Sequence, residues 1–234
     1  MEPGNYESTE VLRCADVIGL VFRLTGGEGF IAGGFARYCV SRNADPIVPA
    51  DIDVFCGDEE AFDRIVTRIR SDKNTVRKSE TRIETKFEYR FSSGYHKDAY
   101  AIQIIKPANI KNMVSDGDVR RVLDNFDFTI AKSAVLPDGT ALCHENFHRD
   151  DEHNALVITN IHCPISSAKR VVKYATKGYS VTSAELLKLF EDYETRSPEW
   201  KDAIRAGLRP EGSDALLGPS ATAHAAFIEL MYFD

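Results

Sequence analysis

The sequence has no long hydrophobic run and no excess of basic residues. Its apolar stretches, such as the six residues from Val17 to Phe22 that include a glycine, are far shorter than the roughly 20 residues that a transmembrane helix needs. The 29 Lys and Arg residues are outnumbered by 36 Asp and Glu residues, which gives a net charge of −7. We therefore expect no membrane span, and no protein that coats nucleic acid or an anionic membrane through bulk positive charge. Any phosphate-bearing partner must therefore be bound by a local group of residues and not by the net charge of the protein.

The sequence also lacks the signs of a secreted protein. Its five cysteines are odd in number, widely spaced and mostly set among apolar neighbours, which favours buried free thiols over a disulfide framework. Residues 1–5 lack the basic start and apolar core of a secretory signal. These observations together predict a cytoplasmic location. A Walker loop and a Gly-x-Ser-x-Gly nucleophile elbow are missing as well.

What is present is an ordinary globular composition, with 43% hydrophobic and 28% charged residues. A chain of 234 residues suits one domain with an appended module. Helix and strand patterns alternate as far as residue 163 and helical patterns alone follow, which predicts an α+β fold. We accordingly expect a head over residues 1–163 and a small helical neck or extension over residues 164–234.

The periodicity of apolar residues and the capping residues predict the individual elements. In the first part we expect a helix capped by Ser8 or Thr9 and ending at Gly26, a strand at 29–32, a helix at 35–41 and a strand at 51–55. A helix capped by Asp58 should follow, and then two strands at 81–91 and 100–105 joined by a turn at 92–94. A helical stretch after 118 and a turn at 137–139 complete this part. In the second part we expect helices at 166–177, 182–193, 198–206 and 221–233.

The most informative residues are two aspartates on one predicted strand. Residues two apart on a strand project from the same face, about 6 to 7 Å apart. Asp51 and Asp53 can therefore meet a common hard cation such as Mg²⁺. Two like charges held together are commonly kept because an ion neutralises them. Taken alone, however, Asp-x-Asp at a strand is more often a solvated acidic edge.

A glycine pair precedes this strand. Gly33 and Gly34 allow backbone to approach a phosphate, and a helix opening at Phe35 aims its unpaired amide groups at such an anion. Arg37 on the first turns of that helix adds a charged donor. A glycine pair, an arginine-bearing helix and an acid pair are the parts that an in-line displacement at phosphorus requires.

In this order the segment resembles the head domain of the DNA polymerase beta nucleotidyltransferase superfamily, and within it the branch of poly(A) polymerases and CCA-adding tRNA nucleotidyltransferases. The segment Asp127-Phe128-Thr129-Ile130 is similar to the Asp-Phe-Thr-Ile-Asn segment of bacterial members. Residues 169–179 are similar to the Arg-rich, aromatic helix that opens the neck of those enzymes. The resemblance spans roughly residues 29–180.

The resemblance implies a mixed sheet flanked by helices and the transfer of a nucleoside monophosphate from an NTP to an acceptor hydroxyl, most simply an RNA or tRNA 3′ end. It implies that Asp51 and Asp53 bind metal, two Mg²⁺ ions in all, and act in catalysis. Gly33, Gly34 and Arg37 would contact the triphosphate. The alternatives are AMP transfer to a protein or a small molecule, and a catalytically inactive module that binds nucleotide or RNA.

Three departures from the family pattern matter, and those at Ala131 and Gln103 support the inactive alternative. Tyr38 stands where the family has aspartate, Ala131 stands where it has asparagine, and Gln103 stands where many members place a third carboxylate. Glu84, Glu88 or Asp127 can supply that carboxylate in its place, and we take Asp127 as a candidate catalytic residue. The chain lacks a long tRNA-gripping tail, so CCA addition itself is not expected.

A basic segment follows the predicted head. Lys169, Lys173 and Lys177 recur every four residues on one predicted helix face, with Arg170 beside them and no acidic residue from 164 to 183. The ordinary interpretation of such a stripe is a solvated surface. In an acidic chain, concentrated positive charge favours nucleic acid or NTP binding, so Lys169, Arg170 and Lys173 are candidate nucleotide-binding residues. The sequence indicates no oligomeric state.

Overall fold

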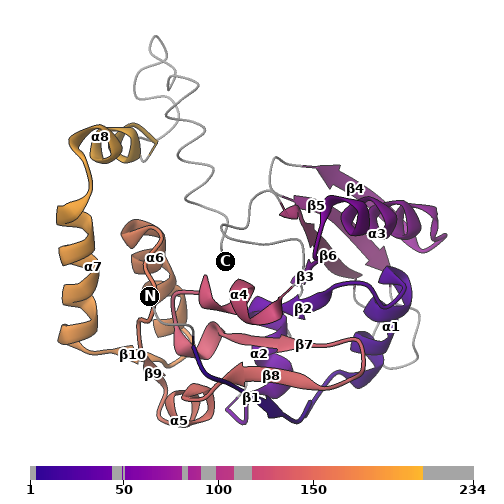
Figure 1. The fold of residues 1–234 in the computed structure, drawn as a ribbon, viewed down its shortest axis with the longest axis horizontal. Coiled ribbons are helices and arrows are strands. Elements are labelled where there is room, and N and C mark those ends of the chain that lie inside the picture. The colour runs from indigo at the N-terminus through magenta and orange to yellow at the C-terminus, as the bar shows by residue number, and fades with distance from the viewer. Residues whose placement is uncertain are drawn as a thin grey trace. The chain divides into compact units, whose positions relative to one another are not determined.

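The computed structural model describes residues 4–43, 49, 51–80, 84–90, 99–107 and 118–207. The chain divides into two compact units, Met1–Asn160 and Ile161–Asp234, whose elements Figure 1 labels. The division lies close to residue 163, where the sequence pattern changes. Each unit is described by itself below.

The first unit is built on one eight-stranded sheet with the order β1-β8-β7-β2-β3-β6-β5-β4. Its strands are β1 Tyr6–Thr9, β2 Phe30–Ala32, β3 Asp51–Phe55, β4 Thr75–Glu80, β5 Glu84–Arg90, β6 Ala99–Ile105, β7 Ser133–Val135 and β8 Ala141–His144. Strands β3 and β6 are parallel, and the other neighbours are antiparallel. A two-residue strand, β9, follows at Ala155–Leu156. The expected mixed sheet is confirmed.

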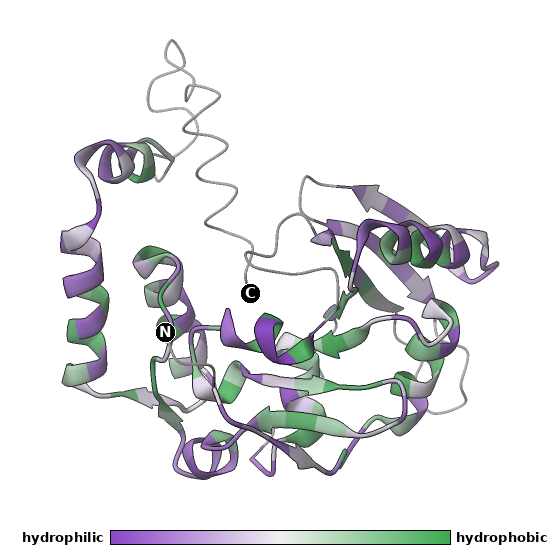
Figure 2. Ribbon diagram, in the orientation of Figure 1, coloured by the Kyte–Doolittle hydropathy of each residue, from purple (hydrophilic) through white to green (hydrophobic). Residues whose placement is uncertain are grey.

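The helices of this unit are α1 Ala15–Thr25, α2 Gly33–Val40, α3 Glu59–Ser71, α4 Val119–Asp124 and α5 Phe147–Glu152, with a short 3₁₀ helix at Thr129–Ala131. Buried apolar residues of α1, α2 and α3 share one core with Ile52, Val54, Ile102 and Ile104 of the sheet. Figure 2 shows β6 as mostly hydrophobic and β4 as largely hydrophilic, which agrees with a central and an edge position in the sheet. The expected α+β fold is confirmed.

The local signals for α3 and for the end of α1 are confirmed. The Ala61 N–H donates to Asp58 Oδ1 at 2.7 Å, and the apolar stripe of α3 that includes Ile65 and Ile69 is buried. Helix α1 ends at Gly26, whose φ of 73° is left-handed. The next amide, of Gly27, donates to the carbonyl of Phe22 at 2.7 Å, as glycine at a helix end typically allows.

The expected start of the first helix is wrong. Ser8 and Thr9 belong to β1, which pairs with β8 so that Thr9 lies opposite Ala141, and α1 begins at Ala15. A local capping signal is overridden because β8 offers a sheet edge on which these residues complete backbone hydrogen bonds. Strand β4 was not expected either; it pairs with β5.

The cysteines and the helices agree with the expectations drawn from composition. All five cysteines are free, and Cys39, Cys56, Cys143 and Cys163 are buried while Cys14 is half-buried. Within the described ranges, none of the helices combines the length and the apolar composition needed to cross a bilayer.

The second unit contains α6 Pro164–Ala175, α7 Ser183–Thr195 and α8 Pro198–Gly207, with a two-residue strand, β10, at Ser180–Val181. The Glu185 N–H donates to Thr182 Oγ1 at 3.2 Å, which confirms Thr182 as a cap. Placing Lys177 on the face of α6 is wrong, because the helix ends at Ala175 and the chain turns at Gly178, with φ 87°. The predicted turn at 92–94 and helix at 221–233 lie outside the described residues.

Candidate functional site

The two candidate metal ligands lie on the sheet face that the three helices do not cover. Ile52 and Val54 of β3 are fully buried against α1, α2 and α3. Asp51 and Asp53 alternate with them and therefore project from the opposite face. The side chain of Asp51 is 58% exposed, and that of Asp53 is half-buried. The acid pair is thus accessible, as the sequence predicts.

The glycine pair lies next to this acid pair. Ala32, the last residue of β2, pairs directly with Asp53 on β3, and the chain then enters α2. Gly33 has φ 77°, a conformation that strains any residue with a Cβ. A Cβ on Gly34 would meet nothing within 4 Å. The backbone at Gly34 therefore has open space beside it, and the binding of a triphosphate to the amides at the start of α2 stays a prediction.

Across the neighbouring strands the same face carries an amide and an ammonium group. Asp53 lies opposite Gln103 on β6, and Gln103 lies opposite Lys86 on β5. Lys86 Nζ reaches diagonally to Asp51 Oδ1 at 3.0 Å. Burial raises the pKa of Glu84, the first residue of β5; Lys86 opposes this rise and Asp51 adds to it. Gln103, at the position expected for a third carboxylate, therefore lies across the sheet between Asp53 and the positively charged Lys86.

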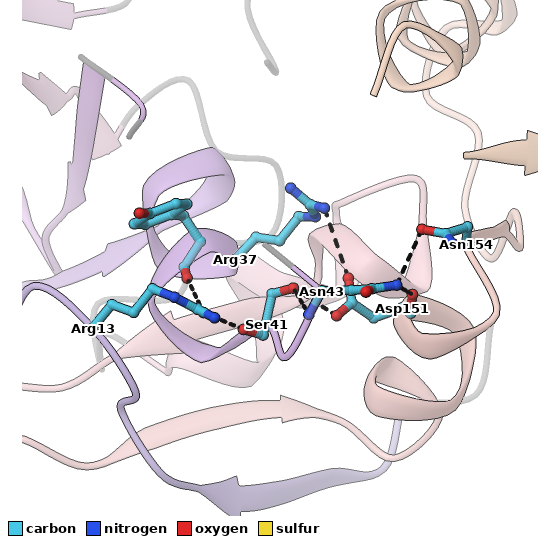
Figure 3. Close-up of polar contacts among 7 residues, drawn as sticks. Arg13, Arg37, Ser41, Asn43, Asp151 and Asn154 are labelled. Atoms are coloured by element: carbon cyan, nitrogen blue, oxygen red, sulfur yellow. Dashed lines mark hydrogen bonds and ion pairs between the residues drawn. The ribbon is translucent and has the colours of Figure 1, made fainter. Parts of the chain in front are cut away.

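Arg37 is directed into the interior of the first unit. It is 2% exposed, and its Nη2 lies 3.7 Å from Oδ1 of Asp151 on α5, which is 1% exposed (Figure 3). The second oxygen of Asp151 accepts a hydrogen bond from Ser41 Oγ at 2.6 Å. Asn43 Nδ2 donates to the Asp151 carbonyl at 3.0 Å. The expected contact between Arg37 and a triphosphate stays a prediction.

Asp127 follows a residue that packs against the far end of β3. The ring of the preceding Phe126 packs against that of Phe55, with centroids 6.1 Å apart. Asp127 is 5% exposed, and its carbonyl accepts from the Thr159 N–H at 2.8 Å. Its charge partly offsets the lowering that burial imposes on the pKa of Lys132. These contacts anchor the segment, and a catalytic role for Asp127 stays a prediction.

Two adjacent acids of helix α5 contact residues from two of the sequence motifs, Thr129 and Arg37. Asp150 Oδ2 accepts a hydrogen bond from Thr129 Oγ1 at 2.6 Å, and Asp151 holds Arg37. Both acids are buried. No local pattern pointed to their burial, because two acids in a charged stretch usually indicate a solvated helix face. Lys86 was missed as well, although charged residues alternate with apolar ones along β5 and could have placed it on the acid face.

The acid pair provides donors that suit Mg²⁺. That ion is typically bound through one or two carboxylates, with water and substrate phosphates completing its shell. Asp51 and Asp53 meet this requirement for one ion. Within the described ranges no group of three His, Cys, Asp or Glu residues is placed to hold a metal. The expected second ion stays a prediction.

The basic residues of the second unit lie on α6. Lys169 and Lys173 are exposed one turn apart, and Arg170 is half-buried. The exposed part of the predicted stripe is thus two lysines long, and their binding role stays a prediction.

Comparison with solved structures shows that this is the nucleotidyltransferase fold. A CCA-adding enzyme in its apo form matches with a TM-score of 0.54 at 13% identity, over 82% of this chain and 46% of that one. The Thermotoga maritima CCA-adding enzyme complexed with tRNA matches with a TM-score of 0.54 at 13% identity, over 87% and 50% of the two chains. The chain spans about half the length of these relatives. No curated protein matches it significantly.

A family model places the chain more narrowly. The model described as Gabija anti-defense 2 family protein matches residues 11–153, which include the glycine pair, the acid pair and Asp127. The chain belongs to this family.

Proposed function

We propose that the protein is a metal-dependent nucleotidyltransferase, which transfers a nucleoside monophosphate from an NTP to an acceptor hydroxyl and releases pyrophosphate. The observation that carries this proposal is the direct pairing of Ala32 with Asp53. This pairing sets the glycine turn, where a triphosphate can approach backbone, beside the two carboxylates that can hold its metal.

The residues have distinct roles in this proposal. Asp51 and Asp53 hold Mg²⁺, which when bound lowers the pKa of the attacking hydroxyl and neutralises the leaving phosphates. Gly33 and Gly34 let the triphosphate meet the free amides at the start of α2. Arg37 lies on the same helix and assists triphosphate binding by holding α2 in place through its ion pair with Asp151. The chain thus contributes mainly by positioning and electrostatics, as phosphoryl chemistry requires.

We propose an RNA 3′ end as the acceptor. One structural neighbour is a CCA-adding enzyme complexed with tRNA, which supports the acceptor class. Lys169, Arg170 and Lys173 on α6 can contact a phosphate backbone. This acceptor predicts that activity falls with rising salt, since each phosphate contact releases counterions.

The family favours a second acceptor. Its description assigns it a role against the Gabija defence. A protein with that role can act by transferring AMP to a hydroxyl of a protein of that defence, with the same acid pair and the same leaving pyrophosphate.

Labelling with α-³²P-NTPs, Mg²⁺ and either total RNA or a lysate containing the Gabija proteins tests both acceptors. Label in RNA supports the first, and label in a protein band supports the second. Asp51→Asn plus Asp53→Asn should abolish labelling, whereas Asp63→Asn, an exposed acid on α3, should leave it unchanged. Activity that survives in the double variant overturns the proposal. ATP binding without pyrophosphate release identifies an inactive nucleotide-binding module instead.

A further inference from the structure

We infer that Lys86 is a built-in competitor of the metal: its ammonium group holds Asp51 in the free protein and must leave this carboxylate when the metal binds. The inference rests on the proposed metal site at Asp51 and Asp53. It assigns a function to a residue of β5 that belongs to none of the motifs.

The ammonium group of Lys86 points to Asp51, although the strand register aligns Lys86 with Asp53. Lys86 lies in register with Asp53 through Gln103, yet its Nζ pairs with Asp51 Oδ1 at 3.0 Å. A carboxylate at position 103 would stand directly opposite Lys86 and offer it a nearer partner. With glutamine there, the formal positive charge of Lys86 is directed to the acid pair itself.

The pair is weak enough to be displaced. The side chains of Lys86 and Asp51 are 34% and 58% exposed, so water and salt screen their attraction. A divalent ion carries twice the charge of the ammonium group and can be coordinated by both carboxylates at once. Metal binding therefore releases Lys86, and the metal affinity of the free protein is reduced by the strength of the pair.

Lys86 approaches the acid pair from the side away from the glycine turn. In the sheet, β2 flanks β3 on one side, while β6 and then β5 follow on the other. A triphosphate at Gly33 and Gly34 is therefore separated from Lys86 by β3 and β6. For this reason the residue should influence metal binding directly and leave metal-free binding of ATP unchanged.

Mn²⁺ titration of the purified full chain, followed by electron paramagnetic resonance, tests the inference without relying on activity. Lys86→Met should bind Mn²⁺ about twofold to fivefold more tightly than wild type, the range expected for an exposed ion pair. The ratio should fall toward one as KCl is raised. Lys78→Met is the matched control: it removes the same charge from β4, where Lys78 pairs with Glu80, and should leave Mn²⁺ affinity at the wild-type value.

The outcomes separate the two proposals. Mn²⁺ binding that is lost in Asp51→Asn but unchanged in Lys86→Met supports the metal site and overturns the role of Lys86. A wild type that binds no Mn²⁺ overturns both. Equal tightening in Lys86→Met and Lys78→Met also overturns the inference, because it indicates a general charge effect. Weaker metal-free ATP binding in Lys86→Met overturns it too, because the residue would then contact phosphate.

Discussion

Arg37 and Asp151 form a buried ion pair between α2 and α5, with Nη2 and Oδ1 3.7 Å apart. Because α2 begins at the glycine turn, this pair ties the proposed triphosphate site to an element that lies far away in the sequence. Asp151 also accepts from Ser41, just after the end of α2. The same carboxylate therefore fixes the helix both in its middle and at its end.

We expect Asp151→Leu to be strongly destabilising. It leaves the Arg37 charge buried without this carboxylate, which typically costs about 3–5 kcal/mol of unfolding free energy. Urea denaturation of Arg37→Met, Asp151→Leu and the double variant measures the coupling. The double variant should lose much less stability than the sum of the two single changes. Additive losses would show that the pair does not act as a unit.

The two glycines of the turn should separate stability from binding. Gly33→Ala forces an alanine into φ 77° and should cost about 1–2 kcal/mol. Gly34→Ala enters open space and should change stability by less than about 0.5 kcal/mol. If a triphosphate approaches the backbone here, Gly34→Ala still weakens ATP binding, measured by calorimetry with Mg²⁺. Wild-type ATP affinity in this stable variant would contradict the proposed triphosphate position.

Introducing an acid at position 103 should strengthen metal binding. Gln103 lies directly opposite both Asp53 and Lys86, so Gln103→Glu adds a third carboxylate to the face and also draws Lys86 away from Asp51. Both effects should raise Mn²⁺ affinity, by about tenfold together, since affinity follows the charge of the ligand set. Gln103→Asn changes side-chain length without adding charge and is the control. No difference between the two variants would place the metal elsewhere.

The lysines of α6 should matter for RNA and not for folding. Lys169→Glu plus Lys173→Glu reverses two exposed charges and should weaken binding of a single-stranded RNA about tenfold or more at low salt, with a shallower dependence on salt. Lys188→Glu, on α7 and 44% exposed, is the control. Filter binding across a KCl series measures both effects, and an equal loss in the control variant would count against a specific surface on α6.

Acidification should destabilise the first unit through His148. Burial, and secondarily Arg42, lowers its pKa below the ordinary 6.5, so the unfolded chain takes up this proton at a higher pH than the folded one. The contribution of neutral His148 to the free energy of unfolding is therefore fully present above about pH 6.5, and it is lost as the pH falls through the lowered pKa of the folded state. Thermal unfolding from pH 8 to 5 should show this decline, and His148→Gln should reduce its slope. An unchanged slope would assign the decline to other groups, such as His144, whose pKa is also lowered.

Local signals predicted the parts of the fold that depend on neighbouring residues. The cap at Asp58, the end of α1 at Gly26 and the two-faced strand with Asp51 and Asp53 each follow from a few consecutive residues, and the structure contains all three. The glycine turn was also predictable, although its closeness to Asp53 depends on the pairing of β2 with β3.

The remaining features depend on contacts that span the chain. Ser8 and Thr9 had the composition of a helix cap, and pairing with β8 decided otherwise. The burial of Asp150 and Asp151 reflects Thr129 and Arg37 reaching them, which no local pattern encodes. Lys86 was readable as a charged residue on an alternating strand, but its partner Asp51 could be known only from the order of β3, β6 and β5.

The pairing of β1 with β8 also has a consequence for synthesis on the ribosome. Tyr6 lies opposite His144, so β1 has no partner in the sheet until β8 has been translated and has left the exit tunnel. Translating the 138 residues that follow Tyr6 as far as His144 at about 5–20 residues per second takes about 7 to 28 s, and β1 stays unpaired for at least that time. The sheet is thus closed late, and a ribosome that stalls before residue 144 holds a chain whose first strand lacks its neighbour.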